Sequence, residues 1–141
     1  DPWLRDRVTR QGDLSHYNSC NVLSLHALLG AYSDEGAQWL DELRPVLADN
    51  IRYACEFIAA HFPGVQVMQP QGTYMLFLDC AAWLQEHHMT LRELEERGAR
   101  AGVIWQDGAA FAWPDSIRMN LALPHSRLVE AMERLRKYAF C

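Results

Sequence analysis

The chain has 141 residues, half of them hydrophobic and 22% charged, and its net charge at pH 7 is −5. This length and composition allow a hydrophobic core, which excludes an intrinsically disordered chain. The 13 basic residues are scattered along the sequence, so we expect no nucleic-acid partner. No apolar run approaches the roughly 20 residues that cross a bilayer, and we therefore expect no membrane partner.

Histidines and cysteines, which often bind metals or form cross-links, show no such pattern here. His87 and His88 are adjacent, and adjacent side chains of a helix point in different directions, so we predict a solvated helix end and no metal site. No C-x-x-C spacing relates the cysteines, which favours free thiols in a reducing compartment and predicts a cytoplasmic location. The cysteines are Cys20, Cys55, Cys80 and Cys141.

The first part of the chain is predicted to be helical. Residues 1–33 show helical spacing with a break around "QGDLSHYNSC" (11–20), and an apolar helix follows the break. Ser33 and the acids after it are typical of a helix start, and apolar residues then recur at helical spacing over 34–62. Because Pro45 lies inside this long stretch, we expect a kink, or two helices that meet there.

The remainder alternates strands with helices. Short strands are expected at 65–69, 73–79, 103–105 and 117–123. Gly72 is expected to give the turn before the second strand its backbone freedom. The capping box Thr90-x-x-Glu93 opens a helix over 91–102, and a final amphipathic helix covers 126–139. This order predicts an α+β (α/β layer) fold, with a small mixed sheet of about four strands covered by helices.

One strand carries a charge in an otherwise apolar run. In "SIRMNLALP" (116–124), alternate residues on one face are apolar, whereas Arg118 and Asn120 lie on the other face. A buried guanidinium costs several kcal/mol unless it is paired, and its planar fork matches a carboxylate. Arg118 is therefore paired with an acid of this chain, such as Asp107 or Asp115, or faces water, or binds an anion.

The residues alone do not complete an active site. There is no glycine-rich phosphate loop and no recognisable Ser/His/Asp arrangement. The chain has a single lysine, Lys137, in a stretch that is typical of a charged helix face. Chemistry that needs a buried, activated lysine therefore has almost no candidate.

Four stretches together resemble the C-terminal part of fold-type I pyridoxal-phosphate enzymes, the class I/II aminotransferase superfamily. They follow the family's order and spacing, and they are "AYSDEGAQWLDELRPVLADN" (31–50), "PQGTYMLFLDC" (70–80), "AGVIWQDGAAFA" (101–112) and "IRMNLALPHSRLVEAMERL" (117–135). Within the superfamily the chain is most similar to the cystathionine β-lyase-like carbon–sulfur lyase branch. This narrower likeness rests on Thr73-Tyr74, on Trp39-Leu40-Asp41 with Asn50, and on Asn120 with Pro124.

The resemblance implies that this chain is one part of a longer enzyme. Residues 34–141 would be the C-terminal small domain, and residues 1–33 would be the tail of the large, cofactor-binding domain or an interface segment. Arg118 would bind the substrate α-carboxylate, with Asn120 as a neighbour that orients it. The Schiff-base lysine and the residues around the cofactor phosphate would lie upstream, because Lys137 does not match that lysine.

The complete protein would then carry pyridoxal 5′-phosphate, act on an amino-acid substrate and form a homodimer. The implied reaction is an α,β-elimination on cystathionine- or cysteine-type amino acids, which gives a thiol, pyruvate and ammonia. This chain alone would hold no catalytic or cofactor-binding residue and would be inactive. Two alternatives stay open: an aminotransferase domain of the same superfamily, and a non-enzymatic module that binds small carboxylates or a protein partner.

Overall fold

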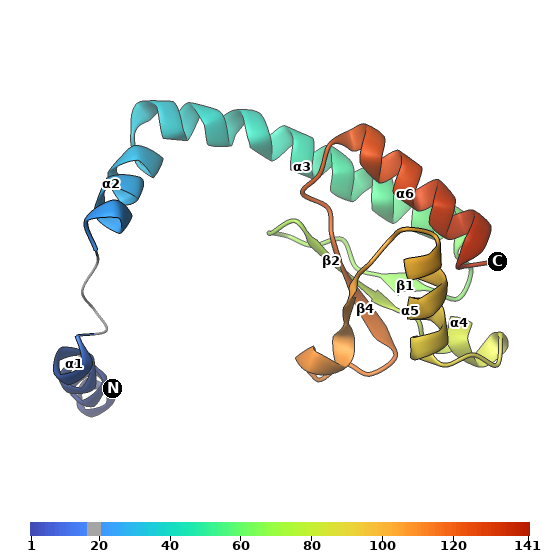
Figure 1. Cartoon of the computed structure of the whole chain (residues 1–141), viewed down its shortest axis with the longest axis horizontal. Helices are drawn as coiled ribbons and strands as arrows, with labels where there is room; N and C mark the ends of the chain where they lie inside the picture. The colour runs from blue at the N-terminus through green and yellow to red at the C-terminus, as the bar shows by residue number, and fades with distance from the viewer. Residues whose placement is uncertain (17–20) are drawn as a thin grey trace. The chain divides into compact units, whose positions relative to one another are not determined.

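The computed structural model describes residues 1–16 and 21–141, so Cys20 and part of the predicted break at 11–20 lie outside the described residues. The chain divides into two compact units, residues 1–42 and 43–141. The helices are α1 (Pro2–Ser15), α2 (Val22–Ala31), α3 (Asp34–His61), α4 (Ala81–Glu86), α5 (Leu91–Arg100) and α6 (His125–Tyr138), with a 3-10 turn η1 (Gly108–Phe111). The strands are β1 (Gln66–Val67), β2 (Met75–Asp79), β3 (Gln106–Asp107) and β4 (Ser116–Asn120), and Figure 1 shows where these elements fall along the chain.

Helices α1 and α2 form the predicted helical start of the chain. The Asp1 side chain accepts a hydrogen bond from Trp3 N at 2.9 Å, and the Asn21 side chain accepts one from Ser24 N at 2.8 Å, so each helix begins at an N-cap. Neither helix has a buried residue, and their large apolar side chains are exposed. That residues 1–33 belong to a large domain stays a prediction.

Helix α3 is one continuous helix. Ser33 Oγ accepts a hydrogen bond from Gly36 N at 3.1 Å, which begins the helix as predicted. The helix runs through Pro45 and ends before Gly64, whose φ of +86° is left-handed and favours glycine. The long helix predicted over 34–62 is confirmed, and the alternative of two helices that meet at Pro45 is wrong. Neither α3 nor any other helix of the described residues is both long and apolar enough to cross a membrane.

The four strands form one sheet in the order β1-β2-β4-β3. The α+β fold is confirmed, but all three strand pairs are antiparallel where a mixed sheet was expected. The strand predicted at 103–105 is also misplaced, since β3 begins at Gln106. Val103 N donates to Gly98 O at 2.9 Å and Gly102 has a φ of +81°, so this stretch closes the end of α5 instead of pairing in the sheet.

Helix α5 begins at the predicted capping box. Thr90 Oγ1 accepts a hydrogen bond from Glu93 N at 3.3 Å, and the Glu93 carboxylate accepts one from Thr90 N at 2.8 Å. The pKa of the Glu93 carboxyl is lowered chiefly by the hydrogen bond from the Thr90 backbone and, second, by the hydrogen bond from the Thr90 side chain. The elements α4 and η1 were not predicted, because six and four residues are too few to show a helical period.

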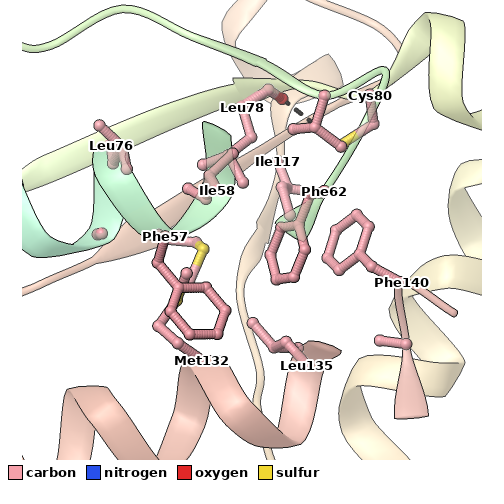
Figure 2. Close-up of a cluster of buried hydrophobic side chains, with 14 of the residues drawn as sticks. Phe57, Ile58, Phe62, Leu76, Leu78, Cys80, Ile117, Met132, Leu135 and Phe140 are labelled. Atoms are coloured by element: carbon pink, nitrogen blue, oxygen red, sulfur yellow. Dashed lines mark hydrogen bonds between the residues drawn. The ribbon is translucent and has the colours of Figure 1, made fainter. Parts of the chain in front are cut away.

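The core lies between one face of the sheet and the helices of the second unit (Figure 2). Leu76, Leu78 and Ile117 point into it from β2 and β4, and none of the three has exposed surface (0%). Side chains of α3 and α6 pack against them, and the rings of Phe62 and Phe140 stack with centroids 4.3 Å apart. The core therefore holds β2 and β4 by alternate residues and directs the intervening residues to the opposite face.

Cys80 belongs to this core. Burial, followed by the Asp79 and Asp115 carboxylates, raises the pKa of its thiol to about 12, so the sulfur stays protonated at neutral pH. Figure 2 shows the thiol near Leu78, whose carbonyl oxygen lies 3.8 Å from Sγ. The cysteines of the described residues, Cys55, Cys80 and Cys141, are free.

Asn50 of α3 is buried, and its amide joins three segments of the second unit. Its Nδ2 donates to Leu121 O and Leu123 O, both at 2.9 Å, and its Oδ1 lies 3.0 Å from Nδ1 of His125. The two leucines follow β4, and His125 begins α6. Because a buried amide must find its partners inside the protein, this cluster fixes the segment that leaves β4 against α3.

Replacing Asn50 with Leu should lower the free energy of unfolding by about 2–4 kcal/mol, because buried carbonyl groups lose their donors. Urea unfolding of the chain, followed by circular dichroism, measures the change. The matched control is Asp49→Asn at the exposed neighbouring position, where the ion pair with Arg52 joins side chains that are 59% and 63% exposed. That control should change stability by less than about 1 kcal/mol, and an equally small change for Asn50→Leu would contradict the bridging role.

Candidate functional site

Strand β4 presents Arg118 on the face of the sheet opposite the core. Ile117 (0% exposed) and Met119 (6%) point into the core, as the alternation predicted, and Arg118 between them is half-buried on the other face. In the sheet register, Arg118 lies beside Phe77 of β2 and Gln106 of β3. Arg118 therefore lies on an inner strand of the sheet, with β2 on one side and β3 on the other.

The two acids suggested as internal partners of Arg118 form no ion pair with it in the described residues. The Asp107 side chain accepts a hydrogen bond from a backbone N–H of η1 at 2.7 Å. The pKa of Glu95 is raised chiefly by the burial of Glu95 itself and, second, by the negative charge of Asp107. The Asp115 backbone oxygen accepts from Cys80 N at 2.9 Å, and its carboxylate contributes to the raised pKa of that thiol. Within residues 1–16 and 21–141, none of the ion pairs includes Arg118. The structure therefore does not show the internal ion pair that the sequence left open.

The guanidinium of Arg118 lies over an aromatic ring. Its Cζ is 4.6 Å from the ring centroid of Phe111, which is a cation–π distance. Phe77 meets Phe111 edge-on, with centroids 5.5 Å apart and ring planes at 87°. Nε of Arg118 is buried without a hydrogen-bond partner among the described residues, whereas its terminal nitrogens are not buried. Those terminal nitrogens are free to bind an anion from outside the chain.

The loop between β3 and β4 brings Phe111 to this position. Ser116, the first residue of β4, donates from Oγ to Trp113 O at 2.7 Å, and Trp113 N donates to Gly108 O at 3.1 Å. Gly108 is buried, and a Cβ there would overlap the side chain of Ser116. The loop is therefore fastened at both ends of η1 to the start of the strand that carries Arg118.

Three non-glycine residues next to β2 and β4 have a left-handed backbone. They are Thr73 (φ 68°), Ala112 (φ 59°) and Asp115 (φ 60°). The turn before β2 was expected to place its unusual backbone at Gly72, but Thr73 adopts it instead. A β-branched residue in this region is strained by about 1–3 kcal/mol, and such strain is characteristic of binding sites.

Asn120 shares the face of Arg118, but its side-chain oxygen is already used by the chain. Oδ1 accepts a hydrogen bond from Ala122 N at 2.8 Å, in the turn that ends β4. No hydrogen bond joins Asn120 to Arg118 in the part of the chain that the structure describes. Its role in orienting the arginine stays a prediction.

The residues of this chain do not fit a pyridoxal-phosphate site beside Arg118. Lys137 is exposed in the last turn of α6, and its Nζ lies 5.1 Å from the ring centroid of Tyr138. Helix α6 packs on the core side of the sheet, away from the face of Arg118. No group of three His, Cys, Asp or Glu side chains suited to a metal ion occurs among the described residues, and His87 stacks on Trp83 at 4.1 Å.

The aromatic residues around the guanidinium were missed by the sequence reasoning. Phe77 follows the period of two in β2, so the alternation that revealed Arg118 also places Phe77 away from the core. Phe111 has no comparable signal, because its position depends on the path of the loop between β3 and β4.

The chain belongs to the aminotransferase class I and II family, whose family model matches residues 9–135. The resemblance of the four sequence stretches to this family is therefore confirmed. Enzymes of this family depend on pyridoxal phosphate. The family and its fold account for an α+β unit with helices packed on a small sheet.

Two curated relatives and one solved structure illustrate the relationship. Protein MalY of Escherichia coli strain K12 is 32% identical over an alignment of 122 residues that covers 84% of this chain and 30% of that protein. The cystathionine beta-lyase of Corynebacterium glutamicum is 34% identical over an alignment of 131 residues that covers 91% of this chain and 31% of that protein. The crystal structure of cystalysin from Treponema denticola, which contains pyridoxal 5′-phosphate, covers 97% of this chain and 34% of its own at 27% identity and a TM-score of 0.80. The chain thus spans about a third of the length of these proteins.

Replacing Gly108 with Ala should lower the free energy of unfolding by about 1–3 kcal/mol, because overpacking a close contact displaces backbone. The added Cβ would meet Ser116 Oγ and would lie 2.8 Å from the backbone oxygens of Ser116 and Trp113. Urea unfolding measures the loss, and Gly72→Ala is the matched control because nothing lies within 4 Å of its added Cβ. Equal stability of the two variants would show that the loop is not held against β4.

Proposed function

We propose that this chain is the substrate-carboxylate-binding part of a pyridoxal-phosphate-dependent carbon–sulfur β-lyase. The complete protein would convert cystathionine- or cysteine-type amino acids and water to a thiol, pyruvate and ammonia. Membership of the aminotransferase class I and II family and the likeness to proteins named cystathionine beta-lyase support this reaction class.

The observation that carries the proposal is the unpaired guanidinium of Arg118. An arginine on an inner strand normally has an acid partner, because an uncompensated charge loses solvation when it is half-buried. Arg118 has no such partner among the described residues, and its accessible terminal nitrogens match the two oxygens of a carboxylate. An amino-acid substrate always supplies that carboxylate, whatever its side chain.

The contribution of this chain to the reaction is positional. Arg118 would hold the α-carboxylate by two parallel hydrogen bonds and so fix the direction of the Cα–H bond, which favours its cleavage by proximity and orientation. Pyridoxal phosphate, when bound by the complete protein, supplies the electron sink that the elimination needs. Asn120 has an exposed amide beside Arg118 and would assist this orientation.

The other parts of the active site would come from polypeptide outside this chain. The single lysine is exposed on α6, which supports placing the cofactor-binding lysine elsewhere and the inactivity of this chain alone. Residues 1–33 would be the tail of the large domain. Their exposed apolar side chains support this assignment, because a free protein surface rarely collects so many. The complete protein would be a homodimer.

Transamination is the second candidate function, because the matching family model describes class I and II aminotransferases. Arg118 would hold the substrate carboxylate in both reactions, so the geometry of this chain does not separate them. The two reactions differ in their need for a keto-acid acceptor, which a lyase does not use.

The complete protein, loaded with pyridoxal phosphate and supplied with cystathionine, should release pyruvate and ammonia without a keto acid. A coupled lactate-dehydrogenase assay measures the pyruvate, and a reaction without enzyme is the control. Turnover only after addition of a keto acid would identify an aminotransferase. Failure with amino acids under both conditions would favour a non-enzymatic module.

Replacing Arg118 with Ala in the complete protein should raise the activation free energy for kcat/KM by ~2–5 kcal/mol, because a charged bidentate contact is lost. Steady-state kinetics with the amino-acid substrate measure the change. Arg127→Ala is a matched control, since Arg127 is an exposed arginine whose ion pair with Glu130 lies at 3.1 Å. Unchanged kinetics for Arg118→Ala would remove the basis of the proposal.

A further inference from the structure

The guanidinium of Arg118 makes a cation–π contact with the ring of Phe111. The separation of 4.6 Å between Cζ and the ring centroid places the cation over the negative face of the ring. No ion pair or hydrogen bond of the described residues holds this guanidinium, and its Nε has no acceptor. The position of the fork before a substrate arrives therefore depends on the ring beneath it.

The ring of Phe111 is itself held from two directions. Phe77, the β2 partner of Arg118, packs edge-on against it at 5.5 Å and 87°. The loop that carries it is tied to the first residue of β4 by the hydrogen bond from Ser116 Oγ to Trp113 O at 2.7 Å. Phe77 pairs with Arg118 in the sheet, and Ser116 belongs to the same strand as Arg118. Both contacts therefore fix the ring of Phe111 relative to β4.

A long arginine side chain has several rotamers of similar energy, and binding that must first select one of them is weakened. A cation–π contact restricts these rotamers without occupying the terminal nitrogens, which a carboxylate needs. An acid partner would hold the fork equally well but would compete with the substrate. An aromatic ring avoids that competition because it takes no hydrogen bond.

We propose that Phe111 is a positioning residue, whose ring holds the Arg118 guanidinium in place for the α-carboxylate of an amino-acid substrate. This inference rests on the proposed role of Arg118 in carboxylate binding. It assigns Phe111 an effect on substrate affinity that passes through Arg118 alone. Phe111 therefore has no effect of its own once Arg118 is removed.

The test compares Phe111→Leu in two backgrounds of the complete, cofactor-loaded protein: the unaltered sequence and Arg118→Ala. In the unaltered background, Phe111→Leu should raise KM for the amino-acid substrate about three- to thirtyfold, with kcat within about twofold. In the Arg118→Ala background, the same substitution should change KM by less than about twofold, because coupled residues are not additive.

Two further variants separate positioning from a structural role. Phe111→Tyr keeps the ring and should hold KM within about twofold of the unaltered protein, and Phe111→Met repeats the loss of the ring with a flexible side chain. Trp113→Leu is the matched control, because Trp113 is an exposed aromatic residue of the same loop (53%) and should leave KM unchanged. Thermal unfolding and cofactor absorbance confirm that each variant is folded and loaded.

The possible outcomes separate the positioning role of Phe111 from the carboxylate-binding role of Arg118. An unchanged KM for Phe111→Leu and Phe111→Met, while Arg118→Ala raises it, would overturn the role of Phe111 and leave that of Arg118 intact. Equal losses from Phe111→Leu in both backgrounds would also overturn it, because the effect would not pass through Arg118. An unchanged kcat/KM for Arg118→Ala would instead reject the proposed function.

Discussion

The antiparallel pairing of β2 with β4 is the constraint on which the site depends. It places Leu76 and Leu78 in one row with Ile117 in the core, and by the same alternation it places Phe77 beside Arg118 on the other face. A shift of β4 by one residue would move the guanidinium into the core and Ile117 to the outer face, at a cost of many kcal/mol. The core therefore fixes the side of the sheet on which Arg118 lies.

Three features then keep the guanidinium available. Neither Asp107 nor Asp115 pairs with Arg118 in the described residues, and the Asp107 carboxylate already accepts a hydrogen bond from the backbone of its own loop. The ring of Phe111 contacts the cation without neutralising it. The buried amide of Asn50 holds the segment that follows β4, so the strand is fastened just beyond the arginine.

The sequence correctly predicted the features that depend only on residues close together in the chain. The capping box at Thr90, the N-cap at Ser33 and the alternation around Arg118 each depend on residues within a few positions of one another. The strand at 103–105 was misplaced because the end of α5 uses Val103, which the residue pattern does not reveal.

The surroundings of Arg118 were less accessible to sequence reasoning. Phe111 lies in a loop where Ala112 and Asp115 adopt left-handed backbones without being glycine, and Thr73 before β2 does the same. Such conformations are imposed by packing between distant segments and carry no sequence signature. The arginine could therefore be found from its strand, whereas the ring beneath it could not.

The bridge made by Asn50 has a consequence for the order of folding. Its amide joins residues that are 71 and 73 positions apart in the chain, so it can form only after a long loop has closed. Loop closure loses chain entropy before such a contact returns any stability, so we expect the bridge to form late in folding. Interactions that form late act mainly on the unfolding rate, so we expect Asn50 to affect the lifetime of the folded state more than the speed of its formation.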